Sequence, residues 1–149
     1  MTRFKTKRAF TIIEIVLVIA LVSILTKIYF INNDFINEYR VKESLNKIIT
    51  DIEYVRNQAI NSAKTMEISF NFDDNSYSYN EKETMIDIEI VKPLKLDYSN
   101  SNRTKFVFTK NGIPAKDGAG TIALIYKHNL YRISVVPVTG MVNLKRDDI

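Results

Sequence analysis

A single carboxylate stands near the start of the longest apolar stretch in the sequence. Residues 10–31 read FTIIEIVLVIALVSILTKIYFI, and Glu14 is the acidic residue among them. An ionised carboxylate in hydrocarbon costs on the order of a few kcal/mol, so an ordinary membrane anchor gains nothing by carrying one. An opposite charge close by would offset much of that cost, and the positive end of a helix dipole would add to the effect. Glu14 is therefore a candidate for ion pairing in an apolar environment.

Few other side chains suggest chemistry. The chain has no Cys, which excludes thiolate catalysis and cysteine metal sites, and its one His, His128, falls in an expected turn. Asp73 and Asp74 also fall in an expected turn, without the spacing of a calcium loop. The Ser residues lack a His–acid constellation, and no glycine-rich phosphate loop occurs. We therefore expect no catalytic residues, no metal site and no cofactor.

The apolar stretch has the length of a membrane span. A helix over residues 10–31 would be about 33 Å long at ~1.5 Å per residue, and a hydrocarbon core is about 30 Å thick. Four basic residues and no acidic residue precede it, and positive charges before a span favour the cytoplasm. We expect a single-pass membrane protein with its N-terminus in the cytoplasm and its C-terminal domain outside. The basic residues are Arg3, Lys5, Lys7 and Arg8.

The start of this stretch resembles a known family signature. Residues 9–20, AFTIIEIVLVIA, are similar to the N-terminal motif of type IV pilins and pseudopilins. The resemblance implies a leader over residues 1–9, cleavage by a prepilin peptidase between Ala9 and Phe10, and methylation of the new Phe10 amine. It also makes Glu14 the carboxylate that acts in assembly. The family usually has Gly immediately before the cut, where this chain has Ala9.

The expected role of Glu14 has a physical basis. After such a cleavage the Phe10 amine would lie one helical turn from Glu14 and could neutralise it. In a helical stack the amine of a neighbouring subunit could serve instead and would draw the two subunits into register. The alternative is a plain membrane anchor, in which an incidental Glu14 is tolerated by snorkelling.

Beyond the span, the sequence predicts that the helix continues. Neither Gly nor Pro occurs between Phe10 and Ile90. Residues 32–64 carry an apolar stripe with alternating spacings of four and three, which is typical of an amphipathic helix. This stripe is expected to pack on the sheet that follows, and a coiled-coil partner is the alternative. Its members are Val41, Leu45, Ile48, Ile52, Val55 and Ala59.

Residues 65–149 change to a period of two. Short runs of alternating apolar and polar residues are separated by turn residues, beginning with Met66, Ile68 and Phe70. Such runs predict several antiparallel strands. The expected fold class is thus α+β, a long N-terminal helix packed on one or more antiparallel sheets in the manner of a pilin.

Further resemblance concerns the subtype. Residues 51–60, DIEYVRNQAI, and the later turns at Asn111-Gly112 and Thr139-Gly140 are similar to the H-type minor pseudopilins of type II secretion, a family that includes FimT-like minor pilins. The arrangement is also similar to the D-type pseudopilin of the Gram-positive competence machinery. The resemblance implies a structural subunit and not an enzyme. Its implied partners are other pilin or pseudopilin subunits, a prepilin peptidase, a membrane platform with its assembly ATPase, and membrane lipid.

Three functions remain open at this point. The leading one is a minor pilin or pseudopilin of a secretion, competence or type IV pilus filament, which would be periplasmic or extracellular once assembled. The second is a DNA-receptor pilin, but 17 Lys and Arg beyond the leader balance 17 Asp and Glu. In addition, Asp147 and Asp148 follow Lys145 and Arg146 directly and cancel their charge. The third is a membrane-anchored exported domain with no filament role.

Overall fold

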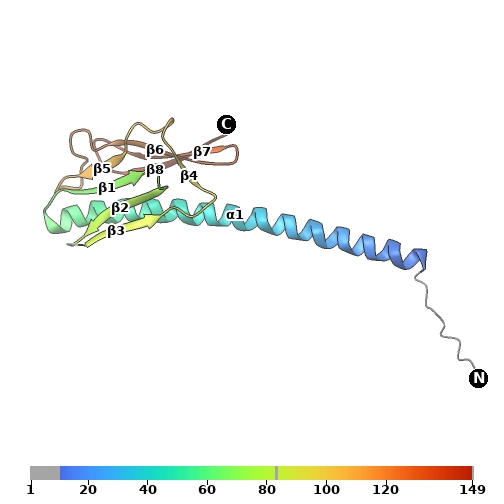
Figure 1. Cartoon of the computed structure of the whole chain (residues 1–149). Helices are drawn as coiled ribbons and strands as arrows, with labels where there is room; N and C mark the ends of the chain where they lie inside the picture. Colours follow the sequence, from blue (N-terminus) through green and yellow to red (C-terminus); the bar gives the residue numbers. More distant parts are fainter. Residues whose placement is uncertain (1–10, 83, 149) are drawn as a thin grey trace, which may run out of the picture. The chain divides into compact units, whose positions relative to one another are not determined.

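One helix and two antiparallel sheets make up the described part of the protein (Figure 1). The computed structural model describes residues 11–82 and 84–148, apart from the side chains of residues 30–33. The chain divides into two units, one ending at Glu38 and the other running from Tyr39 to Ile149. Helix α1, Ile12–Ser62, supplies nearly all of the described part of the first unit and continues into the second.

The first part of α1 is long and apolar enough to cross a membrane. Its most apolar window has a mean hydropathy of 2.4, and none of that window is buried within the protein. The residues expected to form the leader and the cleavage site lie outside the described residues. They are Arg3, Lys5, Lys7, Arg8, Ala9 and Phe10.

The second part of α1 packs through the predicted stripe. Each of the six stripe residues is at most 3% exposed, and all six belong to the core cluster that the helix forms with the strands. This confirms that the stripe packs on the chain's own sheets, as expected, and not on a coiled-coil partner. The helix ends at Ser62, and Ala63 adopts a positive φ of 52° directly after it.

The first sheet has the strand order β3-β2-β1-β5. The predicted alternation is confirmed, because Ile68 and Phe70 of β1 point into the core with Tyr77 of β2 and Phe106 of β5. The neighbouring strands pair in an antiparallel fashion throughout. The strands are β1 (Met66–Asn71), β2 (Ser76–Glu81), β3 (Thr84–Glu89) and β5 (Lys105–Phe108).

The second sheet has the order β4-β6-β7-β8 and is also antiparallel. Ile122 and Leu124 of β6 and Ile133 of β7 are fully buried and join the same core as the first sheet. The chain leaves the first sheet after β3, forms β4, and returns for β5 before completing the second sheet. The strands are β4 (Lys95–Asp97), β6 (Gly120–Tyr126), β7 (Asn129–Val135) and β8 (Val142–Asp148).

Polar contacts fix α1 to both sheets. The Tyr77 hydroxyl of β2 donates to the buried Asp51 carboxylate at 2.5 Å. The Arg56 guanidinium donates from Nε to the carbonyl of Gly112 at 2.9 Å and from Nη2 to that of Thr139 at 3.0 Å. Arg56 thus joins the helix to the loop after β5 and to the turn between β7 and β8.

Candidate functional site

Glu14 lies in the first turn of α1 and closes a capping box with Thr11. The backbone N–H of Thr11 donates to Glu14 Oε2 at 3.3 Å, and the backbone N–H of Glu14 donates to Thr11 Oγ1 at 3.3 Å. These bonds satisfy two backbone donors at the helix start that have no partner within the helix. The spacing Thr-x-x-Glu is the signal for this motif, and the sequence reasoning missed the role of Thr11.

The rest of this segment presents an exposed apolar surface. Every large apolar side chain from Ile12 to Ile28 is at least half exposed, and Ile12 reaches 83%. The hydroxyls of Ser23 and Thr26 donate to backbone carbonyls of their own helix at 2.8 and 2.7 Å. These two side chains therefore need no hydrogen-bond partner outside the helix. Glu14 is therefore the acidic group that needs a partner if this surface enters lipid or a helix bundle.

The two acidic turn residues have a structural explanation. Asn71 accepts a hydrogen bond from the backbone N–H of Asp73 at 3.1 Å, and its amide donates to Asp74 Oδ2 at 2.6 Å. These contacts are what a strand-connecting turn requires. Over the described residues, no group of three His, Cys, Asp or Glu side chains could hold a metal ion. His128 is exposed in the turn between β6 and β7.

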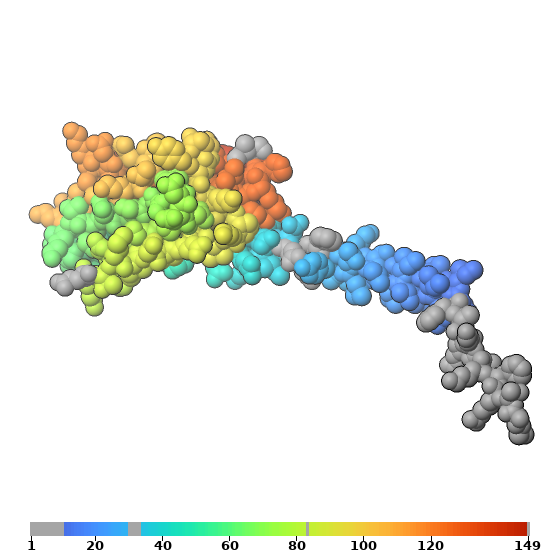
Figure 2. All heavy atoms as spheres, viewed as in Figure 1, coloured from blue at the N-terminus to red at the C-terminus, as the bar shows by residue number. Residues whose placement is uncertain are grey.

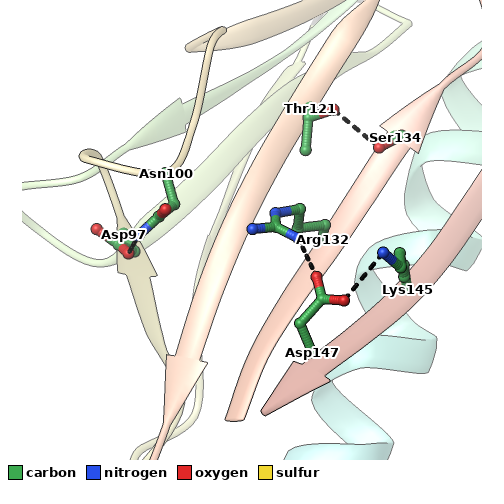
Figure 3. A network of polar contacts seen from close by, with 7 residues as sticks. All are labelled: Asp97, Asn100, Thr121, Arg132, Ser134, Lys145 and Asp147. Atoms are coloured by element: carbon green, nitrogen blue, oxygen red, sulfur yellow. Dashed lines mark hydrogen bonds and ion pairs between the residues drawn. The ribbon is translucent and has the colours of Figure 1, made fainter. Parts of the chain in front are cut away.

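The outer face of the second sheet carries paired charges (Figure 3). Asp147 of β8 contacts Arg132 of β7 and the Lys145 ammonium, the latter at 3.0 Å. The hydrogen bond from Lys145, together with the Arg132 charge, holds the pKa of Asp147 below its ordinary value. Beside them the Thr121 and Ser134 hydroxyls bond one another at 2.8 Å. The Asp147 carboxylate thus offsets the positive charges of Arg132 and Lys145, which DNA binding through this face would need.

Asp97 at the end of β4 completes this surface. It accepts from the Ser99 hydroxyl at 2.7 Å and from the Asn100 amide at 2.6 Å. Burial raises the pKa of Asp97, but these hydrogen bonds outweigh burial and lower its pKa overall. A deprotonated Asp97 therefore orders the loop that follows β4.

A long N-terminal helix that packs its second part against antiparallel sheets is the pilin-like fold, and this chain has it. No protein-family model matches the chain, and no curated protein matches it in sequence. The likeness appears instead among solved structures.

The similar structures are a minor pilin and a minor pseudopilin. The type IV minor pilin FimU of Pseudomonas aeruginosa is similar with a TM-score of 0.58 and 15% sequence identity, over 74% of this chain and 92% of FimU. A second crystal form of FimU gives a TM-score of 0.53 at 14% identity, over 70% and 91%. The minor pseudopilin EpsH of the type 2 secretion system of Vibrio cholerae gives 0.55 at 11% identity, over 71% and 96%. These likenesses establish the fold of the chain.

Proposed function

We propose that this chain is a structural subunit of the minor pilin or pseudopilin kind. One observation carries the proposal: a single helix has an exposed apolar first part with one carboxylate and a second part buried under two sheets. The pilin-like fold shared with FimU and EpsH supports it. Such a subunit contributes contacts to a filament and carries out no chemical reaction.

The proposal extends to maturation. Residues 1–9 are a cytoplasmic leader whose charges are Arg3, Lys5, Lys7 and Arg8. A prepilin peptidase cuts between Ala9 and Phe10, the Phe10 amine is methylated, and residues 10–31 span the membrane. Residues 32–64 continue the helix, and residues 65–149 form the β domain outside the cytoplasmic membrane. The subunit later leaves the lipid by the action of a membrane platform and its ATPase.

Glu14 acts in assembly because its partner at the helix start does not neutralise it. The N–H of Thr11 offers the Glu14 carboxylate one hydrogen bond at 3.3 Å and no charge. An ionised carboxylate in an apolar environment still requires a cation. The Phe10 amine of the same chain, or that of a neighbouring subunit, supplies it in this proposal.

The choice of machine rests on finer resemblance. The segments at residues 51–60, Asn111-Gly112 and Thr139-Gly140 favour an H-type or FimT-like subunit, with the competence pseudopilins as the related alternative. The similar structures include both a type IV minor pilin and a minor pseudopilin of a type 2 secretion system. The proposal is therefore a subunit of one of these filaments.

The mass of the N-terminal peptide tests the proposal directly. The full chain is extracted from membranes of cells that hold their own prepilin peptidase. We expect a peptide that begins at Phe10 and carries one additional methyl group. A mature chain that begins after residue 31 would instead mean a secreted domain. An intact leader beginning at Met1 would contradict the proposed maturation.

A further inference from the structure

Acidic and basic side chains are segregated along the β domain. Residues 66–90 hold seven Asp and Glu and one Lys, whereas residues 91–148 hold ten Lys and Arg and four Asp and Glu. The first range forms β1, β2 and β3, and the second forms the other strands of the two sheets. A domain with one acidic and one basic side can attract a second domain of the same kind, acidic side to basic side.

The acidic side has free charges on β3. Asp87 and Glu89 are exposed, and within residues 11–82 and 84–148 neither carboxylate forms an ion pair or a side-chain hydrogen bond. Together with Met85, which is 68% exposed, they alternate onto the face of the strand opposite half-buried Ile86 and Ile88. Figure 2 shows β3, in yellow-green, along the lower margin of the second unit. We call Met85, Asp87 and Glu89 the acidic flank.

The basic side has free charges in the loop after β5. Lys110 and Lys116 are exposed, and neither has an ion pair in the part of the chain that the structure describes. Lys105 of β5, by contrast, is paired with Glu67 at 2.9 Å. Ile113 lies between the two free lysines in the sequence and is 42% exposed. We call Lys110, Ile113 and Lys116 the basic flank.

Backbone hydrogen bonds hold the basic flank in place. The N–H of Thr109 donates to the Ile113 carbonyl at 2.9 Å, which closes the first turn of the loop. The N–H of Ala115 donates to the Val107 carbonyl of β5 at 2.8 Å, so the loop lies along the outer edge of that strand. Because the loop is already ordered, little conformational entropy is lost when a partner binds there.

The two flanks lie at opposite sides of the first sheet. The strand order β3-β2-β1-β5 places β3 at one margin, and the loop bonded to β5 covers the other. A contact between opposite sides of one sheet requires no reversal of one copy relative to the other. Both copies can then point the same way, as two subunits anchored in one membrane must.

We propose that the acidic flank of one copy of this chain contacts the basic flank of a second copy. Asp87 and Glu89 face the two free lysines, and Met85 packs near Ile113. This inference rests on the proposed function, because it makes the contact one between neighbouring β domains of a filament. Each copy has one flank of each kind, so the contact can repeat from copy to copy. The charges select which surfaces meet, since exposed ion pairs contribute little affinity by themselves.

Thiol cross-linking of the full chain tests the contact, because the native sequence contains no Cys. Copies with Met85→Cys and Ile113→Cys carry different tags, are expressed together in cells that hold the assembly machinery, and are treated with a short bismaleimide. We expect a linked pair of the two tags in several-fold higher yield than with His128→Cys in place of Ile113→Cys. His128 is exposed in the turn between β6 and β7, outside both flanks, and its variant reports random collision.

Charge reversal distinguishes a specific contact from mere proximity. Asp87→Lys with Glu89→Lys in the Met85→Cys copy should lower the yield several-fold. Lys110→Glu with Lys116→Glu in the other copy should restore it, and restoration would also show that neither set of substitutions unfolds the domain. A yield equal to that of the control, a yield that reversal leaves unchanged, or a link to some other protein alone would overturn the contact between copies.

The N-terminal peptide of the same preparations separates this inference from the proposed function. Peptides that begin at methylated Phe10, together with a cross-linking yield at the control level, would overturn the contact and leave the proposed maturation standing. An intact leader, together with a high yield that charge reversal lowers, would overturn the proposed maturation and leave the contact standing.

Discussion

Thr11 and Glu14 bond one another reciprocally at the start of α1, each backbone N–H donating to the side chain of the other at 3.3 Å. The carboxylate that resembles the assembly residue of pilins is therefore also a helix cap. The two roles are compatible, because a carboxylate has two oxygens and can accept from Thr11 while it faces a cation. They differ in what they require of the side chain, since a cap needs an acceptor and ion pairing needs a charge.

Glu14→Gln separates these two roles. A glutamine at this position still completes a capping box, but it cannot neutralise an amine. We expect Glu14→Gln and Glu14→Ala to insert in the membrane and be cleaved normally, yet to enter filaments at least ten-fold less than the native chain. Quantitative blotting of sheared filaments against total membrane protein measures this.

Ser23→Ala is the matched control, because Ser23 lies in the same apolar segment and bonds only within its own helix. It should enter filaments at the native level. Full incorporation of Glu14→Gln would show that the charge is dispensable and would contradict the proposed role of Glu14 in assembly.

Thr11→Val tests the cap without touching the carboxylate. Loss of an N-cap hydroxyl costs about 1 kcal/mol of helix stability, and the effect is confined to the first turn. We expect faster amide hydrogen exchange at Glu14 in detergent micelles, with exchange around Val41 unchanged. Filament entry should fall less than with Glu14→Gln, and a larger fall would mean that Thr11 itself contacts a neighbour.

Much of the fold follows from periodicity alone. The four-three spacing from Val41 to Ala59 and the alternation from Met66 to Phe70 identify buried faces, and the structure buries them. These signals are local, so they can be seen in a sequence. The same holds for Glu14, whose charge is conspicuous in an apolar segment.

What the sequence did not show depends on contacts between distant residues. The division into two sheets arises because β4 pairs with β6 and not with β3, and Asn75 closes the outer edge of β4. Likewise Arg56 on α1 finds carbonyl partners 56 and 83 residues away. No periodic pattern encodes such pairs, so they became visible only in the structure.

Gly140→Ala should destabilise the second unit. Gly140 has a φ of +69°, and a Cβ there would lie 2.4 Å from the carbonyl oxygen of Gly112 and 3.0 Å from Arg56 Nε. Strained backbone and a forced shift together cost about 1–3 kcal/mol. Urea unfolding of the full chain in detergent measures the loss. Val138→Ala in the same turn, where the side chain is 77% exposed, should stay within about 0.5 kcal/mol of the native chain.

Tyr77→Phe should also destabilise the fold, whereas Tyr126→Phe should not. Both tyrosines are buried, but the Tyr77 hydroxyl donates to Asp51 while the Tyr126 hydroxyl has no partner among the described residues. Removing the Tyr77 hydroxyl leaves a buried carboxylate short of a donor, which costs about 1–3 kcal/mol. Removing the Tyr126 hydroxyl deletes an unsatisfied polar group and should be neutral or stabilising. Equal losses in urea unfolding would contradict the Asp51–Tyr77 bond.

The same pair predicts a loss of stability in alkali. Burial, with the hydrogen bond to Asp51, raises the pKa of Tyr77 well above its ordinary value of 10.0. Below pH 10 Tyr77 keeps its proton in both the folded and the unfolded chain, so the contribution of Tyr77 to stability is present in full. Above it the unfolded chain loses the proton first, and stability falls with rising pH toward the folded pKa. Unfolding midpoints should therefore decline more steeply above about pH 10 in the native chain than in Tyr77→Phe, and parallel curves would show that Tyr77 titrates normally.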